Sequence, residues 1–292
     1  MEAGALIRMP LFVVVFGTPW TISTASFASE SCDEVTRPHV VDVYPSTSVV
    51  PQNLLRFYLY FDAAMDRESS RSQYFVRDEH GGVIDSVFLS TRFELWSEDA
   101  RRLTLLLDPG RIKTGISGEG NSKNLLKPQH RFELIIGGAL MSQAGCPLTD
   151  DFKHPFFVSQ PDRISPNPNK WALELPLANS RESLRVKLQE PLEHVSLAYR
   201  IRVKTSSGAS VRGGISLGRE DRTWRFTPHE LWMEGEYQLV VDPMLEDLAG
   251  NRPVGLFDDP TGESRTRHES AQPIVISFQV RSDRSQGPRP EE

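Results

Sequence analysis

The chain has 292 residues, of which 38% are hydrophobic, 25% charged and 9% aromatic, and its formal net charge is -6. These proportions are close to globular averages and exclude a multipass membrane protein, a collagen-like repeat and a disordered acidic chain. The mildly negative charge argues against a nucleic-acid-binding protein, which usually has a basic domain. The length predicts about two domains, each large enough to bury a core of its own.

Residues 1–28 have the pattern of a secretory signal peptide. Arg8 supplies a short positive region, residues 11–17 are apolar, and Ser26-Phe27-Ala28 fits a cleavage site before Ser29. The apolar run is far shorter than the roughly 20 residues that a membrane span needs. We therefore expect an exported protein, in the periplasm, at the cell surface or outside the cell, with no transmembrane span.

The chain has two cysteines, Cys32 and Cys146. In an oxidising compartment such a pair most simply forms one disulfide. In the chain-entropy description, closing a loop of this length contributes about 4 kcal/mol. Two free thiols in a cytosolic protein are the alternative. No Cys-x-x-Cys or Cys/His cluster suggests zinc.

An internal repeat follows the signal sequence. Residues 130–147 resemble residues 235–253, and upstream residues 103–109 and 55–61 line up with residues 223–228 and 184–188. Each segment alternates apolar and polar residues, which predicts strands with one buried and one solvated face. Short strands separated by glycine-containing turns are typical of antiparallel β-sandwiches. Helical periodicity is almost absent, so we expect an all-β fold with two tandem sandwiches.

The segments between the repeats set the expected domain boundaries. Three prolines between residues 159 and 170 indicate a short, semi-stiff linker. The expected plan, in chain order, is the following: signal peptide 1–28, first sandwich 29–160 with a loop insertion at 113–127, linker 161–170, second sandwich 171–281 and disordered tail 282–292.

Three short motifs make the repeats similar to bacterial Ig-like domains of the SbsA type. These motifs are Val43-Tyr44-Pro45, Phe61-Asp62-Ala63-Ala64-Met65-Asp66 and Asp247-Leu248-Ala249-Gly250-Asn251. The resemblance covers most of residues 38–160 and, less completely, residues 171–281. It implies Ig-like sandwiches, an envelope or surface location and a role in spacing, display or adhesion. It implies no catalytic residues.

Each repeat departs from this family pattern at one place. In the first repeat, Ala144-Gly145-Cys146 stands where the family has Ala-Gly-Asn. In the second repeat, Gln189-Glu190-Pro191-Leu192 stands where the opening Phe-x-x-x-Met motif is expected. The first departure places Cys146 in the turn that follows a strand.

Asp247, Gly250 and Asn251 are the polar turn residues of the second repeat. We predict a structural turn in which Asp247 caps backbone N–H groups and Gly250 or Asn251 is left-handed. A calcium site is less favoured, because the sequence lacks a loop that supplies enough oxygen ligands. The nearest approach to a metal or catalytic cluster is Glu190, Glu193 and His194, for which we expect a solvated loop. No metal or cofactor is predicted.

Five basic residues of the second repeat form a possible ligand surface. Arg185 and Lys187 share the polar side of one strand, and Arg200, Arg202 and Lys204 share that of the next. If both strands belong to one sheet, they form a basic face suited to an anionic glycan or an acidic protein. In Ig-like sandwiches the two strands often belong to opposite sheets, which splits the face. We favour an ordinary solvated surface.

No nucleophile, metalloprotease or phosphate-binding motif occurs in the sequence. The leading hypothesis is a non-catalytic, exported binding, display or structural module of the bacterial envelope, whose partner is an unidentified envelope protein or glycan. One alternative is an all-β hydrolase or carbohydrate-active enzyme, which requires a cleft with two carboxylates. Another is a chaperone-like pair of Ig domains that donates a strand to its partners. The sequence does not determine the oligomeric state.

Overall fold

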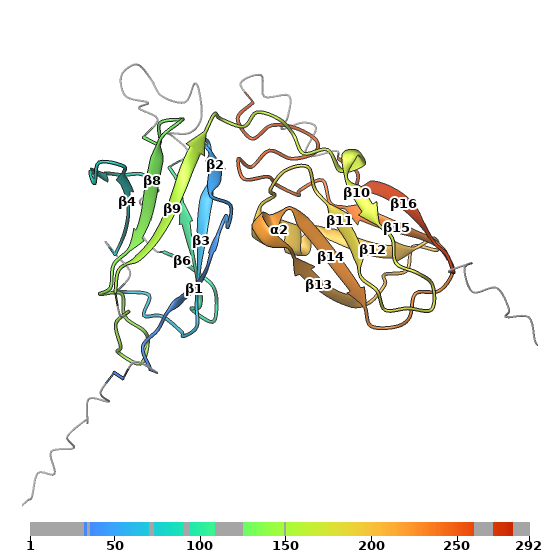
Figure 1. Cartoon of the computed structure of the whole chain (residues 1–292), viewed down its shortest axis with the longest axis horizontal. Coiled ribbons are helices and arrows are strands. Elements are labelled where there is room, and N and C mark those ends of the chain that lie inside the picture. The colour runs from blue at the N-terminus through green and yellow to red at the C-terminus, as the bar shows by residue number, and fades with distance from the viewer. Residues whose placement is uncertain are drawn as a thin grey trace, which may run out of the picture. The chain divides into compact units, whose positions relative to one another are not determined.

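A computed structural model describes residues 32–33, 36–69, 73–89, 94–108, 125–148, 150–259 and 271–282. The predicted signal peptide, most of the 113–127 insertion and the tail after residue 282 lie outside these described residues. Apart from one six-residue α-helix and two short 3-10 helices, the regular elements described are all strands (Figure 1). The prediction of an all-β sandwich fold is confirmed.

The first sandwich consists of a four-stranded and a five-stranded sheet. The four-stranded sheet has the order β1 (Val40–Tyr44), β3 (Arg56–Phe61), β7 (Arg102–Leu106) and β6 (Leu95–Trp96). The five-stranded sheet has the order β2 (Val49–Pro51), β9 (Phe152–Ser159), β8 (Arg131–Ile136), β4 (Tyr74–Asp78) and β5 (Val83–Ile84). All pairs are antiparallel except β2–β9. Alternate residues of β3, such as Phe57 and Leu59, fill the core between the sheets.

The second sandwich has its own core, which contains Trp224 and Trp232. One sheet has the order β10 (Ala172–Glu174), β11 (Leu184–Lys187), β14 (Thr223–Pro228) and β13 (Gly213–Leu217). The other has the order β12 (Ile201–Thr205), β15 (Gly235–Val241) and β16 (Ile274–Val280). The short helices are η1 (Pro168–Lys170), α2 (His194–Tyr199) and η2 (Arg219–Asp221).

Helix α2 lies where the sequence predicts a solvated loop, so that prediction is wrong. Glu193 precedes the helix and is only 5% exposed. Its carboxylate accepts hydrogen bonds from the backbone N–H groups of Val195 and Ser196, at 3.1 and 2.6 Å. Because glutamate is not among the preferred N-cap residues and six residues give no measurable periodicity, the sequence contained no helix signal.

The hydrogen bonds of the two sandwiches correct the repeat alignment. The N–H of Phe61 donates to the Arg101 carbonyl, and the N–H of Leu188 donates to the Arg222 carbonyl, both at 2.9 Å. Phe61 therefore corresponds to Leu188, and Phe57 rather than Leu55 corresponds to Leu184. A slip of two residues keeps each side chain on the same face, so the alternation could not reveal it.

The corrected alignment also restores the motif that the second repeat lacks in the sequence comparison. Met65 and Leu192 are both fully buried, and their N–H groups donate to the carbonyls of Ala100 and Asp221. Leu188-x-x-x-Leu192-Glu193 is thus the counterpart of Phe61-x-x-x-Met65-Asp66. The second repeat conserves the apolar and acidic character of the motif with different residues.

Cys32 and Cys146 form the predicted disulfide, with a Cα–Cα distance of 5.5 Å and a sequence separation of 114. Cys146 is buried in the turn after β8, and Cys32 is the first described residue. The disulfide ties the beginning of the first sandwich to this turn. Within the described part of the chain, no helix has the length and apolar character needed to cross a membrane.

Candidate functional site: the junction between the two sandwiches

The main site is a junction at which the segment after β15 contacts the first sandwich. Leu248 is buried and belongs to the core cluster of the first sandwich. The N–H of Leu55, just before β3, donates to the Leu248 carbonyl at 3.1 Å. One residue from the second repeat therefore completes the apolar packing of the first.

An ion-pair cluster lies beside this apolar contact. Glu246 accepts a 2.7 Å hydrogen bond from Arg56 Nη2 of β3 and another 2.7 Å bond from Arg252 Nη2. The Glu246 side chain is only 14% exposed, and those of Arg56 and Arg252 are 25% and 21% exposed. Charge-assisted bonds in such a partly buried setting contribute more than exposed surface pairs do.

Aromatic side chains of the first sandwich contact α2. The rings of Tyr44 and His194 are stacked, with centroids 3.4 Å apart and an interplanar angle of 21°. His194 Nδ1 is 2.9 Å from Oδ1 of the buried Asp221. Burial and the nearby Asp42 raise the pKa of Tyr44 to about 12. Burial, together with Glu193, also raises the pKa of Tyr58. Tyr58 lies on the outer face of β3 and is nevertheless only 6% exposed.

The segment predicted as a linker is hydrogen bonded to both sandwiches. Asn53 donates from Nδ2 to the Asp162 carbonyl at 2.7 Å and accepts from the Asp162 N–H at 2.8 Å. Asn251 donates to the same carbonyl at 3.3 Å. Arg163 pairs with Asp258 at 3.0 Å. These bonds anchor the chain at the point where it passes from one sandwich to the next.

The predicted turn residues lie at the centre of the junction. Asp247 Oδ1 accepts from the N–H groups of Ala249 and Asn251, both at 2.8 Å, and Asn251 Nδ2 donates to Asp247 Oδ2 at 2.9 Å. Gly250 has a φ of +78°. This is the geometry of a capped turn. Among the described residues, no group of three or more His, Cys, Asp or Glu side chains is placed to hold a metal ion.

Gly250 has a packing role in addition to its conformational one. A Cβ at this position would lie 2.3 Å from Leu55 Cδ1. Gly145, at the corresponding turn of the first sandwich, has a φ of +81° and open space around it. We expect Gly250→Ala to lower the free energy of unfolding by about 1–3 kcal/mol, through strain and the clash with Leu55.

The matched control for this prediction is Gly145→Ala, because it adds the same backbone strain without the clash. Urea denaturation of both variants measures the two losses. A loss in Gly250→Ala no larger than in Gly145→Ala would show that the close approach to Leu55 is not important for stability.

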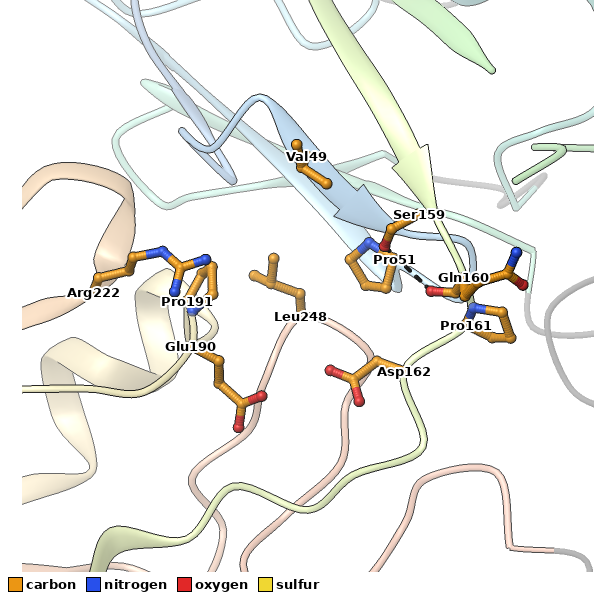
Figure 2. A pocket seen from close by; sticks show the side chains of 10 residues that line it. All are labelled: Val49, Pro51, Ser159, Gln160, Pro161, Asp162, Glu190, Pro191, Arg222 and Leu248. Carbon is orange, nitrogen blue, oxygen red and sulfur yellow. Dashed lines mark hydrogen bonds between the residues drawn. The ribbon is translucent and has the colours of Figure 1, made fainter. Parts of the chain in front are cut away.

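A cavity of about 330 Å³ opens beside the turn, lined by both sandwiches and the linker. Figure 2 shows Asp162 and Glu190 entering it from different segments, together with Leu248 and Arg222. Burial and the nearby Asp162 raise the pKa of Glu190 to about 7. Burial and Asp162 also raise the pKa of Asp247 to about 8, against the lowering effect of its hydrogen bonds from Asn251. The junction thus concentrates carboxyl groups that oppose one another's ionisation.

This arrangement makes stability depend on pH. Because the folded pKa values of Glu190 and Asp247 are raised, their contribution is fully present below the unfolded values near 4 and is lost as pH rises through about 7 to 8. We expect the free energy of unfolding to fall between about pH 4 and pH 8. Urea titrations at several pH values measure this fall, and Glu190→Gln should make it smaller, leaving the part due to Asp247. A flat wild-type profile would contradict the prediction.

The structure places the five predicted basic residues on two different sheets. Arg185 and Lys187 lie on β11, whereas Arg202 and Lys204 lie on β12 and Arg200 directly precedes it. The condition for a single basic face of these five residues is therefore not met. Arg185 and Lys187 both pair with Glu174, and Arg200 pairs with Asp242 at 2.9 Å.

Arg225 is a basic residue that the sequence comparison missed. It lies directly opposite Arg185 in the β11–β14 register. The alternation of Trp224, Arg225 and Phe226 indicated its outward direction, but only the strand order shows which basic residues are its neighbours.

Comparisons with known proteins identify no family. No protein-family model matches the chain, and a search of curated proteins finds no match. Among solved structures, an Escherichia coli alpha-2-macroglobulin fragment spanning domains MG0-NIE-MG1 is 15% identical, with a TM-score of 0.28, and the match covers 73% of this chain and 68% of that one.

Two further structures are similarly distant. The N-terminal part of the bacterial S-layer protein SbsC is 13% identical, with a TM-score of 0.28 and coverage of 70% of this chain and 40% of that one. The Ig1-2 module of the Drosophila receptor protein tyrosine phosphatase DLAR is 11% identical, with a TM-score of 0.24 and coverage of 70% and 91%. At these values the likeness carries no argument about function.

Proposed function

We propose that this chain is a non-catalytic, exported protein in which the junction holds two β-sandwiches in one fixed orientation, as a binding, display or structural module of the cell envelope. The bridging of Arg56 and Arg252 by Glu246 is the observation that carries the proposal. Sandwiches on a free linker would move independently. A charged bridge, a shared apolar core and an anchored linker all oppose such motion.

Export is supported by two independent features. The N-terminal sequence has the pattern of a signal peptide. The Cys32–Cys146 disulfide is typical of oxidising compartments such as the periplasm and the cell exterior. The resemblance of residues 38–160 to bacterial Ig-like domains favours the envelope over free secretion.

Two measurements test the proposal. Backbone ¹⁵N relaxation of the exported form should give one rotational correlation time for both sandwiches, and two separate times would contradict the fixed orientation. Co-sedimentation with washed envelope fractions of the native host, at low and high salt, tests the envelope role. Pelleting is the expected result, and its absence would contradict that part of the proposal.

One observation favours a second candidate, an all-β hydrolase. The junction cavity contains two carboxyl groups, Asp162 and Glu190, and the pKa of Glu190 is raised to about 7 by burial and by Asp162. A glycosidase needs one carboxyl as an acid and the other ionised, with pKa values moved apart. Here burial raises the pKa of Asp162 as well, and the described lining contains no aromatic side chain for a sugar to stack on.

A hydrolase screen with polysaccharide and glycoside substrates decides between the two candidates. The proposed function predicts no activity above the level of Glu190→Gln. Activity in the wild type that is lost in Glu190→Gln would establish the hydrolase instead.

A further inference from the structure

The turns at one end of the first sandwich correspond to those at one end of the second. In the second sandwich, α2, the η2 turn and the Asp247–Asn251 turn form the end that contacts the first sandwich. In the first sandwich, the corresponding turns have matching backbone geometry. Ala100 and Asp221 are both left-handed, with φ of 55° and 51°, and Gly145 and Gly250 have φ of 81° and 78°. The first sandwich therefore has an end equivalent to the one that docks in the second.

The sheet face of the first sandwich that the second sandwich contacts also has a counterpart in the second sandwich. Tyr44, Tyr58 and Thr104 are neighbours across β1, β3 and β7, on the face that contacts α2. In the second sandwich, the residues in the same positions across β10, β11 and β14 are Glu174, Arg185 and Arg225. The side chains of Arg185 and Lys187 are 55% and 63% exposed. This face, which we call the basic sheet face, consists of Glu174, Arg185, Lys187 and Arg225.

The free end of the first sandwich has the opposite charge. We call it the acidic end, and its exposed acidic residues are Asp33, Asp62, Glu68, Glu98 and Asp99. Three arginines also lie at this end: Arg37 donates to the Cys32 carbonyl, Arg67 to the Ser97 and Glu98 carbonyls, and Arg101 to the Asp62 carbonyl. The five exposed carboxylates outnumber these arginines, so the acidic end is negative on balance. The acidic end and the basic sheet face are therefore complementary in charge.

From the repeated contact surfaces and their charges, we infer that the acidic end of one copy binds the basic sheet face of another, as the second sandwich binds the first within one chain. Such a contact is heterologous and leaves one free surface on each terminal copy, so it produces open head-to-tail assemblies. The inference uses the junction of the proposed function as its template.

Gln143, which is exposed, occupies the position that corresponds to the buried Leu248. The contact between copies therefore has no buried apolar residue like Leu248 at the junction. We therefore expect weak, electrostatic and salt-sensitive association.

Sedimentation velocity of the exported, disulfide-bonded protein tests the inference. At low salt, the weight-average sedimentation coefficient should rise with protein concentration, and at high salt it should return to the monomer value. A wild type that remains monomeric at every concentration would overturn the inference.

Charge reversal identifies the surfaces. Arg185→Glu/Lys187→Glu, on the basic sheet face, and Glu68→Lys/Glu98→Lys, on the acidic end, should each be monomeric alone. An equimolar mixture should associate again, because each reversed surface then meets an unlike partner. Arg202→Glu/Lys204→Glu is the control, because it makes the same charge change on the other sheet. It alters neither proposed surface, so it should associate like the wild type.

The outcomes separate this inference from the proposed function. Association that survives reversal of the basic sheet face, or a mixture that stays monomeric while both variants show wild-type circular dichroism, would overturn the inference. A monomeric wild type with a single rotational correlation time would overturn the inference alone. Separate correlation times in a protein that still associates through these residues would overturn the proposed function alone.

Discussion

Replacing Cys32 and Cys146 together by serine is expected to lower the free energy of unfolding of the first sandwich by about 4–5 kcal/mol. The disulfide joins residues that are 114 positions apart, so its loss releases a long closed loop in the unfolded chain. In the folded state, loss of the disulfide also releases the segment before β1 from the turn that contains Cys146. A loss of this size is comparable to much of the stability of a single domain.

Two optical signals distinguish the sandwiches in this experiment. Far-ultraviolet circular dichroism reports on both sandwiches, whereas Trp171, Trp224 and Trp232 of the second core dominate the tryptophan fluorescence. Urea denaturation should therefore show an early circular dichroism transition that fluorescence does not share. Adding reductant to the wild type is the control and should reproduce the shift. A double-serine variant with the wild-type midpoint in both signals would contradict the prediction.

Replacing Glu246 by glutamine is expected to weaken the junction by about 2–3 kcal/mol, because Arg56 and Arg252 both lose their carboxylate partner in a partly buried setting. The substitution keeps the shape of the side chain and removes only the charge. The expected results are a lower unfolding midpoint and separate rotational correlation times for the two sandwiches in ¹⁵N relaxation.

Glu174→Gln is the matched control, since Glu174 also bridges two basic residues, Arg185 and Lys187, but its side chain is 43% exposed. Its loss should be much smaller than that of Glu246→Gln, because exposed ion pairs contribute little to stability. A double-mutant cycle that combines Glu246→Gln with Arg56→Gln isolates the energy of the Arg56–Glu246 pair. Equal losses in Glu246→Gln and Glu174→Gln would show that the junction pair has no special role.

Local sequence signals predicted the strands well. The alternation of Phe57, Leu59 and Phe61 with polar neighbours gave β3, and Trp224 and Phe226 gave β14, because the side-chain period of a strand is two residues. The same alternation could not fix the pairing of the repeats, since a shift of two residues preserves every inward and outward direction. Hydrogen-bond partners were needed to match Phe61 with Leu188.

The candidate site was less accessible to sequence analysis. Tyr58 and Arg56 have the pattern of a solvated strand face, and they are covered only because the second sandwich contacts them. Glu246 lies 190 residues from Arg56, and neither residue differs from an ordinary surface charge in its local sequence. The turn at Asp247 was visible as a capping pattern, but its position at the junction was not.

By itself, the sequence determined the features that depend on neighbours along the chain, namely the all-β class and the strand positions. It favoured a disulfide between the two cysteines over two free thiols, and the structure shows that disulfide. Tertiary structure decided which sheet each basic strand joins, why Glu193 begins a helix and which outer faces are buried. These features depend on contacts between residues that are far apart in sequence, and a strand face has the same local pattern whether water or a second sandwich covers it.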